Sequence, residues 1–160
     1  MHIRVATMKD LDAISQLSAQ IQRDQYRSEP DLFLTPDQVS DEEYRHYWKQ
    51  VLNGRENRIF VAEQEGRIVG YVSAHILRFE MPFMIKKNMG RIGTIVVAYS
   101  MQRLGVGRRL SEHAEQWLVS AGAQEVALEV LERNTDAQSF YTTQGYKTCT
   151  RTLSKTLSRA

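Results

Sequence analysis

The 160-residue sequence predicts an α/β fold in which helices cover the faces of a mixed sheet. Three observations favour this fold class. Apolar residues recur at helical spacing near the N-terminus, the middle of the chain changes to the shorter period of strands, and a glycine-containing turn joins a strand to a helix near residue 105. The element order, β-α-α-β-β-β-α-β-α-β-β, is typical of a mixed sheet with helices on its faces. We expect one domain over residues 1–160.

The first third of the chain predicts one strand and two helices. Ile3 and Val5 alternate as in a short strand, and a helix with Asp10 as its candidate cap follows. Residues 24–38 hold two of the three prolines and interrupt the helical period. A second helix places aromatic and aliphatic residues on one face and ends at Asn53-Gly54. The residues that define these two apolar faces are Ile14, Leu17 and Ile21, then Tyr44, Tyr47, Trp48, Val51 and Leu52.

The remaining two thirds predict most of the sheet. Residues 59–62 and 68–79, joined by Glu65-Gly66, are typical of a β-hairpin. Residues 80–90 are expected to form an irregular loop. Further expected elements are a strand at 92–97, a helix at 105–120, a strand at 126–131, a helix at 134–143 ended by Gly145, and one or two strands in the tail.

Composition excludes several classes of protein. With 21 basic and 19 acidic residues, the net charge of +2 does not favour nucleic acid or a membrane as the main partner. Cys149 is the only cysteine, so an intramolecular disulfide and a multi-cysteine zinc site are both excluded. The N-terminus lacks the apolar stretch of a signal peptide, and no run approaches the roughly 18 apolar residues of a membrane span. We therefore expect a cytoplasmic protein without a metal.

The segment from Ile95 to Gly107 carries the most chemical information. A buried strand ends in a turn, and glycines open an amphipathic helix, which is how a chain builds a phosphate cradle from backbone N–H groups and a helix N-terminus. Arg103, Arg108 and Arg109 add positive charge beside it. The alternative is that the glycines serve only the turn.

Two other phosphate motifs fit this segment less well. A Walker A loop requires Gly-Lys-Ser/Thr, but Gly107 is followed by two arginines. The dinucleotide fingerprint G-x-G-x-x-G fails because Leu110 stands at the third glycine position.

The pattern Gln102-x-x-Gly105-x-Gly107 resembles the Q/R-x-x-G-x-G/A signature of GNAT acetyltransferases. The resemblance implies the GNAT acyl-CoA N-acyltransferase fold, with a mixed, mostly antiparallel central sheet flanked by helices. It also implies that loop amides hold the pyrophosphate of acetyl-CoA and that the end of the preceding strand pairs with the pantetheine arm. Tyr99 stands where many members carry proline. The residues expected to bind acetyl-CoA are therefore Ile95, Val96, Val97, Gln102, Arg103, Leu104, Gly105, Val106, Gly107 and Arg108.

A second segment, from Asn134 to Tyr146, resembles the N-x-x-A-x-x-F/L-Y-x-x-x-G-F/Y pattern of the same family. Ala137 and Tyr141 stand four residues apart and so share one helix face. The resemblance implies that Asn134 and Ala137 line the path of acetyl-CoA, and that Tyr141 is the general acid that protonates the leaving thiolate.

The sequence identifies the acceptor site and the base less clearly. The family builds its acceptor pocket from the first helices and the loop before the fourth strand, where this chain offers Tyr26, Phe33, Glu80 and Phe83. No Asp or Glu lies between Arg91 and Gln102, where some relatives place a catalytic glutamate. Glu129, Glu80 and His75 remain candidate bases. A route through Cys149 is disfavoured, because that residue lies beyond both motifs.

We expect an acetyl-CoA-dependent N-acetyltransferase that acts on a primary amine of a small molecule or a protein. The alternative is a non-catalytic acyl-CoA sensor that keeps the binding site without turnover. A nucleic-acid module comes third, because the arginines are interleaved with Glu112 and Glu115. A homodimer is left open.

Overall fold

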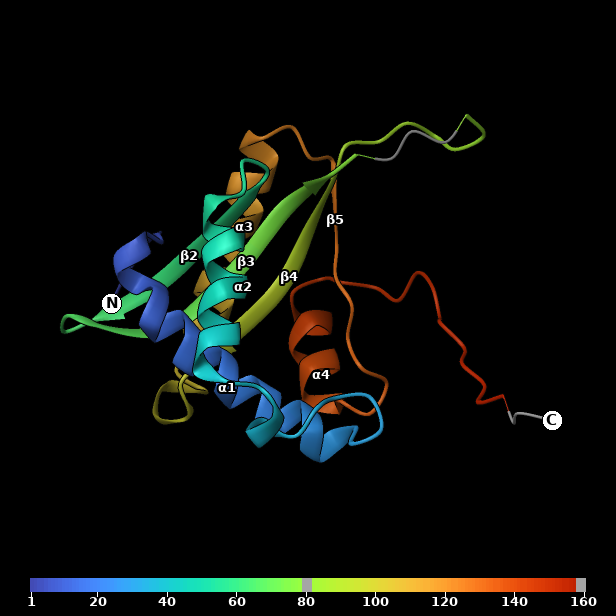
Figure 1. Cartoon of the computed structure of the whole chain (residues 1–160). Coiled ribbons are helices and arrows are strands. Elements are labelled where there is room, and N and C mark those ends of the chain that lie inside the picture. Colours follow the sequence, from blue (N-terminus) through green and yellow to red (C-terminus); the bar gives the residue numbers. More distant parts are fainter. Residues whose placement is uncertain (79–81, 158–160) are drawn as a thin grey trace. The chain divides into compact units, whose positions relative to one another are not determined.

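The computed structural model describes residues 1–78 and 82–157 and divides the chain into two compact units (Figure 1). Met1–Glu129, the sheet unit, contains β1 (His2–Val5), α1 (Leu11–Ser28), α2 (Asp41–Asn53), β2 (Asn57–Gln64), β3 (Arg67–Leu77), β4 (Met89–Val97), α3 (Val106–Ser120) and β5 (Glu125–Ala127). Val130–Ala160, the C-terminal unit, contains α4 (Thr135–Thr143). The expected single domain over residues 1–160 stays a prediction.

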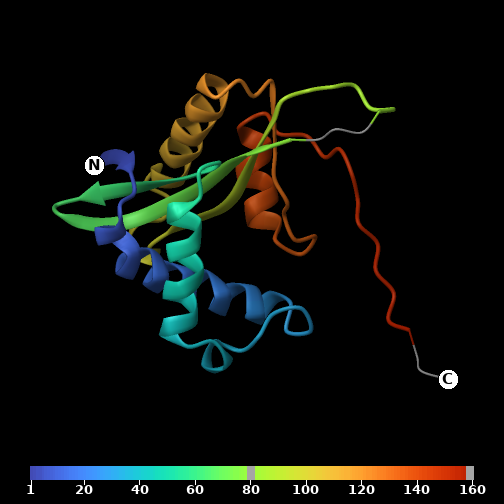
Figure 2. The ribbon, with the colours of Figure 1, turned by 45° about the horizontal axis from the view of Figure 1, so that its top comes forward.

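The sheet unit has five strands in the order β1-β2-β3-β4-β5. All neighbouring strands are antiparallel except β4 and β5, which are parallel. α1 and α2 cover one face of the sheet and α3 covers the other (Figure 2). The expected fold class, a mixed and mostly antiparallel sheet flanked by helices, is confirmed.

Alternation along the strands divides the core between the two faces. On the first face, Ile59, Val61, Tyr71 and Val96 pack with Leu11, Ile14 and Leu17 of α1 and Trp48 of α2. On the second face, the ring of Phe60 lies 5.0 Å from that of His113 and 6.2 Å from that of Trp117, both on α3. A side chain added at Gly90 would lie 2.6 Å from Leu118, so this glycine allows α3 to pack closely on β4.

An ion-pair network fixes the start of α1 to the sheet. The guanidinium of Arg4 donates two hydrogen bonds of 2.8 Å to the Asp10 carboxylate and a third of 2.8 Å to Glu63. The backbone N–H of Thr7 also donates to Asp10, at 2.8 Å. The Arg4 guanidinium holds the pKa of Asp10 at about 2, below its ordinary value of 3.8. Asp10 precedes α1 as expected, but its carboxylate binds Arg4 and Thr7 and makes no capping hydrogen bond to α1.

Two regions expected to contain strands differ from the structure. The strand expected at residues 126–131 is shorter, because the pairing of β5 with β4 ends at Ala127. The strands expected in the tail are wrong for its described part, since residues 147–157 contain no regular element. Alternating residues predict a strand only where a partner strand completes the hydrogen bonds, and no described strand pairs with this segment.

Candidate active site

One edge of β4 is open along most of its length. β4 pairs with β5 only through Met89–Arg91, and no described strand pairs with Ile92–Val97 on that side. We call Ile92–Val97 the free edge of β4. Ala98 donates its N–H to the carbonyl of Val69 at 2.9 Å, which shows that alternate residues of this segment bond to β3. The N–H and C=O groups of Ile95 and Val97 therefore point away from β3, toward the open side.

A bulge precedes these two residues. The β3–β4 register shifts between Val72 and Ala74, and the N–H of Thr94 donates to the hydroxyl of Ser73 at 2.9 Å. A Cβ added at Gly93 would lie 2.8 Å from that hydroxyl oxygen, so a side chain there would displace the Ser73 hydroxyl from the Thr94 N–H. The bulge keeps the Thr94 N–H satisfied on the β3 side.

The free edge runs directly into the glycine loop and the N-terminus of α3. Arg103 and Gly105 adopt left-handed backbone conformations, with φ of 62° and 79°. Gly105 is the N-cap, and its carbonyl accepts the N–H of Arg109 at 3.1 Å. The N–H groups of residues 106–108 precede the helical bonds, so they are available to an anion at the positive end of the helix dipole. A loop of this geometry can bind an anion through its backbone, and the expected phosphate cradle stays a prediction.

Two glutamines fix the junction between the free edge and the loop. The carbonyl of Val97 accepts hydrogen bonds from Gln102 Nε2 at 3.2 Å and from Gln20 Nε2 at 2.9 Å. Gln102 of the sequence motif therefore holds the loop against the end of β4. Gln20 was not among the expected site residues. The available signal in the sequence was a glutamine between Leu17 and Ile21, next to the apolar face of α1, and the structure shows that it is buried.

Other contacts anchor the loop and its arginines. The hydroxyl of Tyr99 donates to Asp24 of α1 at 2.6 Å, which ties the loop to α1. Arg108 pairs with Glu112 at 2.9 Å, one turn along α3. Arg109 donates to the carbonyl of Met1 at 3.4 Å. These contacts connect the loop to α1 and to the N-terminus of the chain within the sheet unit.

In the sheet unit, a cavity of about 380 Å³ lies between α1, residues 32–39, α2 and the sheet. Its polar lining residues are Ser18, Gln22, Gln25, Tyr44, Tyr71 and Thr94. The apolar ones include Phe33, Tyr47 and Trp48. Because Thr94 belongs to the free edge, the cavity reaches β4 within that edge.

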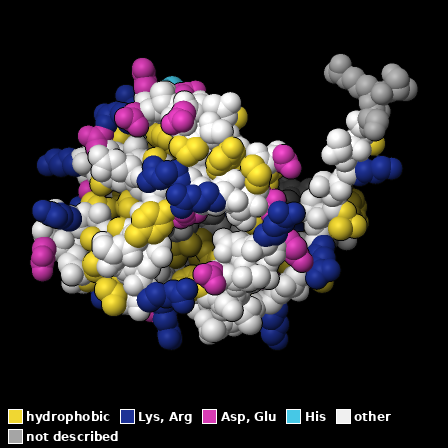
Figure 3. All heavy atoms as spheres, turned by 90° about the horizontal axis from the view of Figure 1, so that it is seen from below, with side chains coloured by type: hydrophobic (Ala, Val, Ile, Leu, Met, Phe, Trp, Pro, Cys, Tyr) yellow, Lys and Arg dark blue, Asp and Glu magenta, His cyan; other side chains and the backbone are white. Residues whose placement is uncertain are grey.

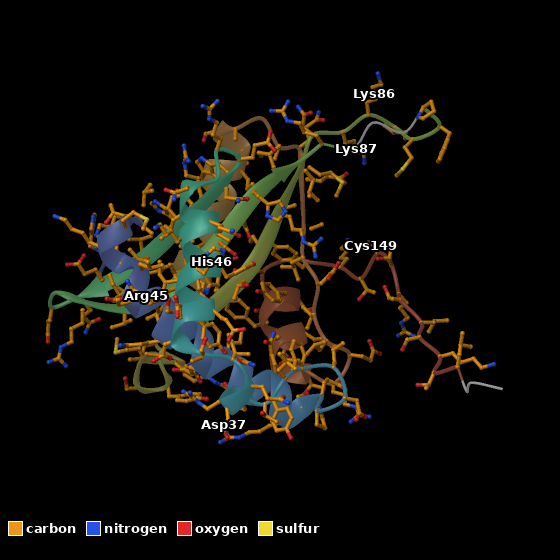
Figure 4. All side chains as sticks on the ribbon, viewed as in Figure 1. Asp37, Arg45, His46, Lys86, Lys87 and Cys149 are labelled. Carbon is orange, nitrogen blue, oxygen red and sulfur yellow. The ribbon has the colours of Figure 1, made fainter. Side chains whose placement is uncertain are left out.

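The residues expected at the acceptor site are only partly brought together. Phe33 lines the cavity. Tyr26 does not line it, and neither does Phe83, which is 81% exposed on the β3–β4 loop. Figure 4 shows this loop, with Lys86 and Lys87, extending away from the strands. Glu80 lies outside the described residues.

The two described candidate bases lie at the other end of β4, on or beside its paired part. Glu129 forms an ion pair of 2.8 Å with Arg91. Burial, and then the charge of Arg91, lower the pKa of His75, whose strand position pairs with Arg91. His75 is therefore neutral near pH 7 and can accept a proton.

The C-terminal unit carries the second motif. Asn134 caps α4, with its side-chain oxygen accepting the N–H of Ala137 at 3.0 Å. The ring of Tyr141 lies edge-to-face against Phe140 and Tyr146, with centroids 5.0 and 5.4 Å away. Burial raises the pKa of the Tyr141 hydroxyl to about 12, so it stays protonated at neutral pH. Cys149 is exposed on the segment after α4 (Figure 4).

Two further properties bear on the class of protein. Among residues 1–78 and 82–157, no group of three or more His, Cys, Asp or Glu side chains could hold a metal ion. Among the same described residues, no helix is both long enough and apolar enough to cross a membrane.

Comparison with known proteins identifies the family. The profile of the Acetyltransferase (GNAT) family matches residues 19–146. An N-alpha-acetyltransferase of Sulfurisphaera tokodaii is 32% identical over 114 residues, which cover 66% of each chain, just under two thirds. An uncharacterized N-acetyltransferase of Archaeoglobus fulgidus is 26% identical over 144 residues, 90% of this chain and 91% of that protein.

Solved structures agree on the fold. A mutant of a Bacillus halodurans protein superimposes with a TM-score of 0.88 at 21% identity, covering 98% of this chain and 99% of the other. An aminoglycoside N-acetyltransferase, AAC(6')-Iy in complex with CoA, has a TM-score of 0.75 at 18% identity, covering 98% and 93%. Since the family profile spans most of the sequence and both segments that carry the motifs, this chain belongs to the Acetyltransferase (GNAT) family.

Proposed function

We propose that this protein transfers the acetyl group of acetyl-CoA to a primary amine by direct attack, with Tyr141 as general acid. The observation that carries the proposal is the continuity of the free edge of β4 with the N-terminus of α3. Both parts lie in the sheet unit, and both present backbone hydrogen-bonding groups to one extended ligand.

The groups present fit acetyl-CoA. The pantetheine arm contains amides, which can pair with the N–H and C=O groups of Ile95 and with the N–H of Val97 as an added strand would. The pyrophosphate suits the N–H groups at the start of α3, where the helix dipole also favours negative charge. Arg103 and Arg108 lie at the same loop and can add charge-assisted hydrogen bonds to the phosphates.

The proposed reaction needs only acetyl-CoA, the amine, Tyr141 and water. The neutral amine nitrogen attacks the thioester carbonyl carbon and forms the C–N bond. The C–S bond then breaks, and the sulfur takes the proton of the Tyr141 hydroxyl. The amine loses one proton to water, and the tyrosinate recovers one from water. A backbone N–H of the free edge can polarise the thioester carbonyl, a role that suits preorganised amides.

The acceptor is proposed to be a small amine first, and a protein α-amino group or lysine next. The S. tokodaii relative is named for α-amino acetylation, and the structural neighbour AAC(6')-Iy for an aminoglycoside acceptor. Acetyl transfer to an amine is common to both names. The acceptor of this chain is therefore a separate question from its reaction.

No nucleic-acid partner is proposed. The face of the molecule in Figure 3 carries basic, acidic and apolar side chains intermixed, without one continuous basic patch. The expected cytoplasmic location and the absence of a membrane partner stay predictions.

Two measurements on the full chain test the proposal. Acetyl-CoA at one hundred times its dissociation constant should stabilise the fold by about 2.7 kcal/mol, visible as a higher melting temperature. A thiol-release assay with a panel of amines should then show turnover. Stabilisation without turnover on any amine would favour the non-catalytic sensor, and no thermal shift together with no calorimetric signal would reject acetyl-CoA binding altogether.

A further inference from the structure

Two residues of the cavity wall, Gln22 and Tyr44, each carry a polar atom that lacks a partner. The side-chain oxygen of Gln22 and the hydroxyl of Tyr44 are both buried, and neither has a hydrogen-bond partner among the described residues. Both residues line the cavity. The Gln22 amide nitrogen donates to the carbonyl of Leu34 at 3.1 Å, which fixes the orientation of the oxygen. Buried polar atoms are usually satisfied, so an unpaired acceptor in a cavity wall indicates a missing donor.

Several other polar groups of the wall are already engaged. The hydroxyls of Ser18 and Tyr71 bond to each other at 2.8 Å, and the N–H of Thr94 donates to Ser73. A ligand donor at Gln22 Oε1, which can only accept, or at Tyr44 Oη, which can accept or donate, displaces no hydrogen bond of the described residues.

The described lining of the cavity also carries no charge. None of its residues is Asp, Glu, Lys, Arg or His. Asp37, on the loop between α1 and α2, does not line it (Figure 4). Trp48, Tyr71 and Phe33 give it an aromatic wall instead. An amine with a single nitrogen can enter such a wall in its neutral form, but a polycation needs carboxylates to replace the hydration that its charges lose.

We propose that the acceptor is a monoamine on an uncharged apolar body about the size of an aromatic ring, held in this cavity with its N–H groups donating to Gln22 and Tyr44. This inference rests on the proposed acetyltransferase function and names its substrate class. The uncharged wall has a second consequence for the reaction. It disfavours the ammonium form of a bound amine and so favours the neutral nucleophile, without a carboxylate base.

Binding can be measured independently of turnover through Trp48. The chain has two tryptophans. Trp117 packs on α3 against Phe60, on the opposite face of the sheet, so Trp117→Phe leaves Trp48 as the only indole reporter. With coenzyme A saturating, phenethylamine should change the Trp48 fluorescence and bind at least about tenfold more tightly than spermidine, a polycation without an apolar body.

Two variants test the wall. Tyr44→Phe keeps the ring and removes the hydroxyl, and it should weaken phenethylamine binding by roughly three- to tenfold without changing the affinity for acetyl-CoA. Phe33→Glu adds a carboxylate to the wall and should shift the ratio of kcat/KM for the two amines toward spermidine by about tenfold or more. Ile85→Glu is the matched control, because Ile85 is 82% exposed on the β3–β4 loop and does not line the cavity; it should leave the ratio within about twofold.

The outcomes separate this inference from the proposed function. If acetyl-CoA binds and is consumed while spermidine is preferred, or while neither amine changes the Trp48 signal, the inference is wrong and the enzyme activity stands. Unchanged binding in Tyr44→Phe would likewise remove the cavity as the amine site. If acetyl-CoA produces no stabilisation of the wild type, the proposed function fails, and the inference fails with it.

Discussion

The free edge of β4 with its glycine loop and the cavity between α1 and α2 are adjacent in the sheet unit but are built from different groups. The first offers backbone N–H and C=O groups, set by the strand pairing and by the left-handed Gly105. The second is formed by side chains from α1, the following loop, α2 and the sheet. A backbone site tolerates most side-chain changes. Substitutions in the cavity wall can therefore change the proposed acceptor without changing the proposed acetyl-CoA site.

The largest expected effect concerns chemistry rather than either binding region. Tyr141→Phe removes one hydroxyl and keeps the ring contacts with Phe140 and Tyr146. Turnover should fall by about ten- to ten-thousandfold, the range of a lost general acid that water partly replaces. Affinities for acetyl-CoA and for the amine should stay nearly unchanged. Steady-state rates and calorimetry check this; an unchanged rate with acetyl transfer shown to be rate-limiting would make Tyr141 a packing residue.

The next prediction compares two glycines with left-handed backbones, of which only one lies at the proposed acetyl-CoA site. Gly105 and Gly66 have φ of 79° and 73°, and a Cβ on either would meet nothing within 4 Å. Alanine at each position should therefore lower the free energy of unfolding by a similar amount, roughly 1–2 kcal/mol. Only Gly105→Ala should also weaken acetyl-CoA binding, by about tenfold, because it disturbs the N–H groups at the start of α3. Urea unfolding and calorimetry measure both, and equal acetyl-CoA affinity in the two variants would show that the loop does not hold the phosphates.

The glycine loop also shows what the sequence could predict. Its position after a strand, its spacing and its helix were all predictable, because they depend on residues close together in the chain. Gln20 and the cavity were not, since Gln22, Tyr44 and Tyr71 meet only after α1, α2 and β3 have packed. The prediction of strands in the tail was wrong for the same reason, because an alternating pattern does not show whether a partner strand exists.

A smaller effect should appear in the scaffold that both regions share. Asp10 has a pKa of about 2 when folded, below its ordinary 3.8, so its stabilisation is complete above about pH 4 and is lost as the pH falls toward 2. The loss should be at most about 2 kcal/mol, because Arg4 is partly exposed. Urea unfolding at pH 6 and pH 3 should show a smaller difference for Asp10→Asn than for the wild type. An equal difference in both would assign the acid sensitivity to other carboxylates.

The smallest effects are expected for the candidate bases. Alanine at His75, Glu129 or Glu80 should lower turnover by less than about a hundredfold, because the cavity wall and water, rather than one side chain, are expected to deprotonate the amine. The rate should rise with pH toward the pKa of the amine itself. If turnover in one variant falls more than about a thousandfold, and the pH–rate profile also loses its limb near neutral pH, the replaced residue is the general base.

The most direct test of the central claim is amide hydrogen exchange along β4, with and without saturating coenzyme A, followed residue by residue by NMR. Ile95 and Val97 face the open side, whereas Val96 and Ala98 lie in the alternate register that bonds to β3. If the pantetheine arm pairs with the free edge, exchange at Ile95 and Val97 should slow strongly on binding, while Val96 and Ala98 change little. Unchanged exchange at Ile95 and Val97, with binding confirmed by calorimetry in the same sample, would contradict the account.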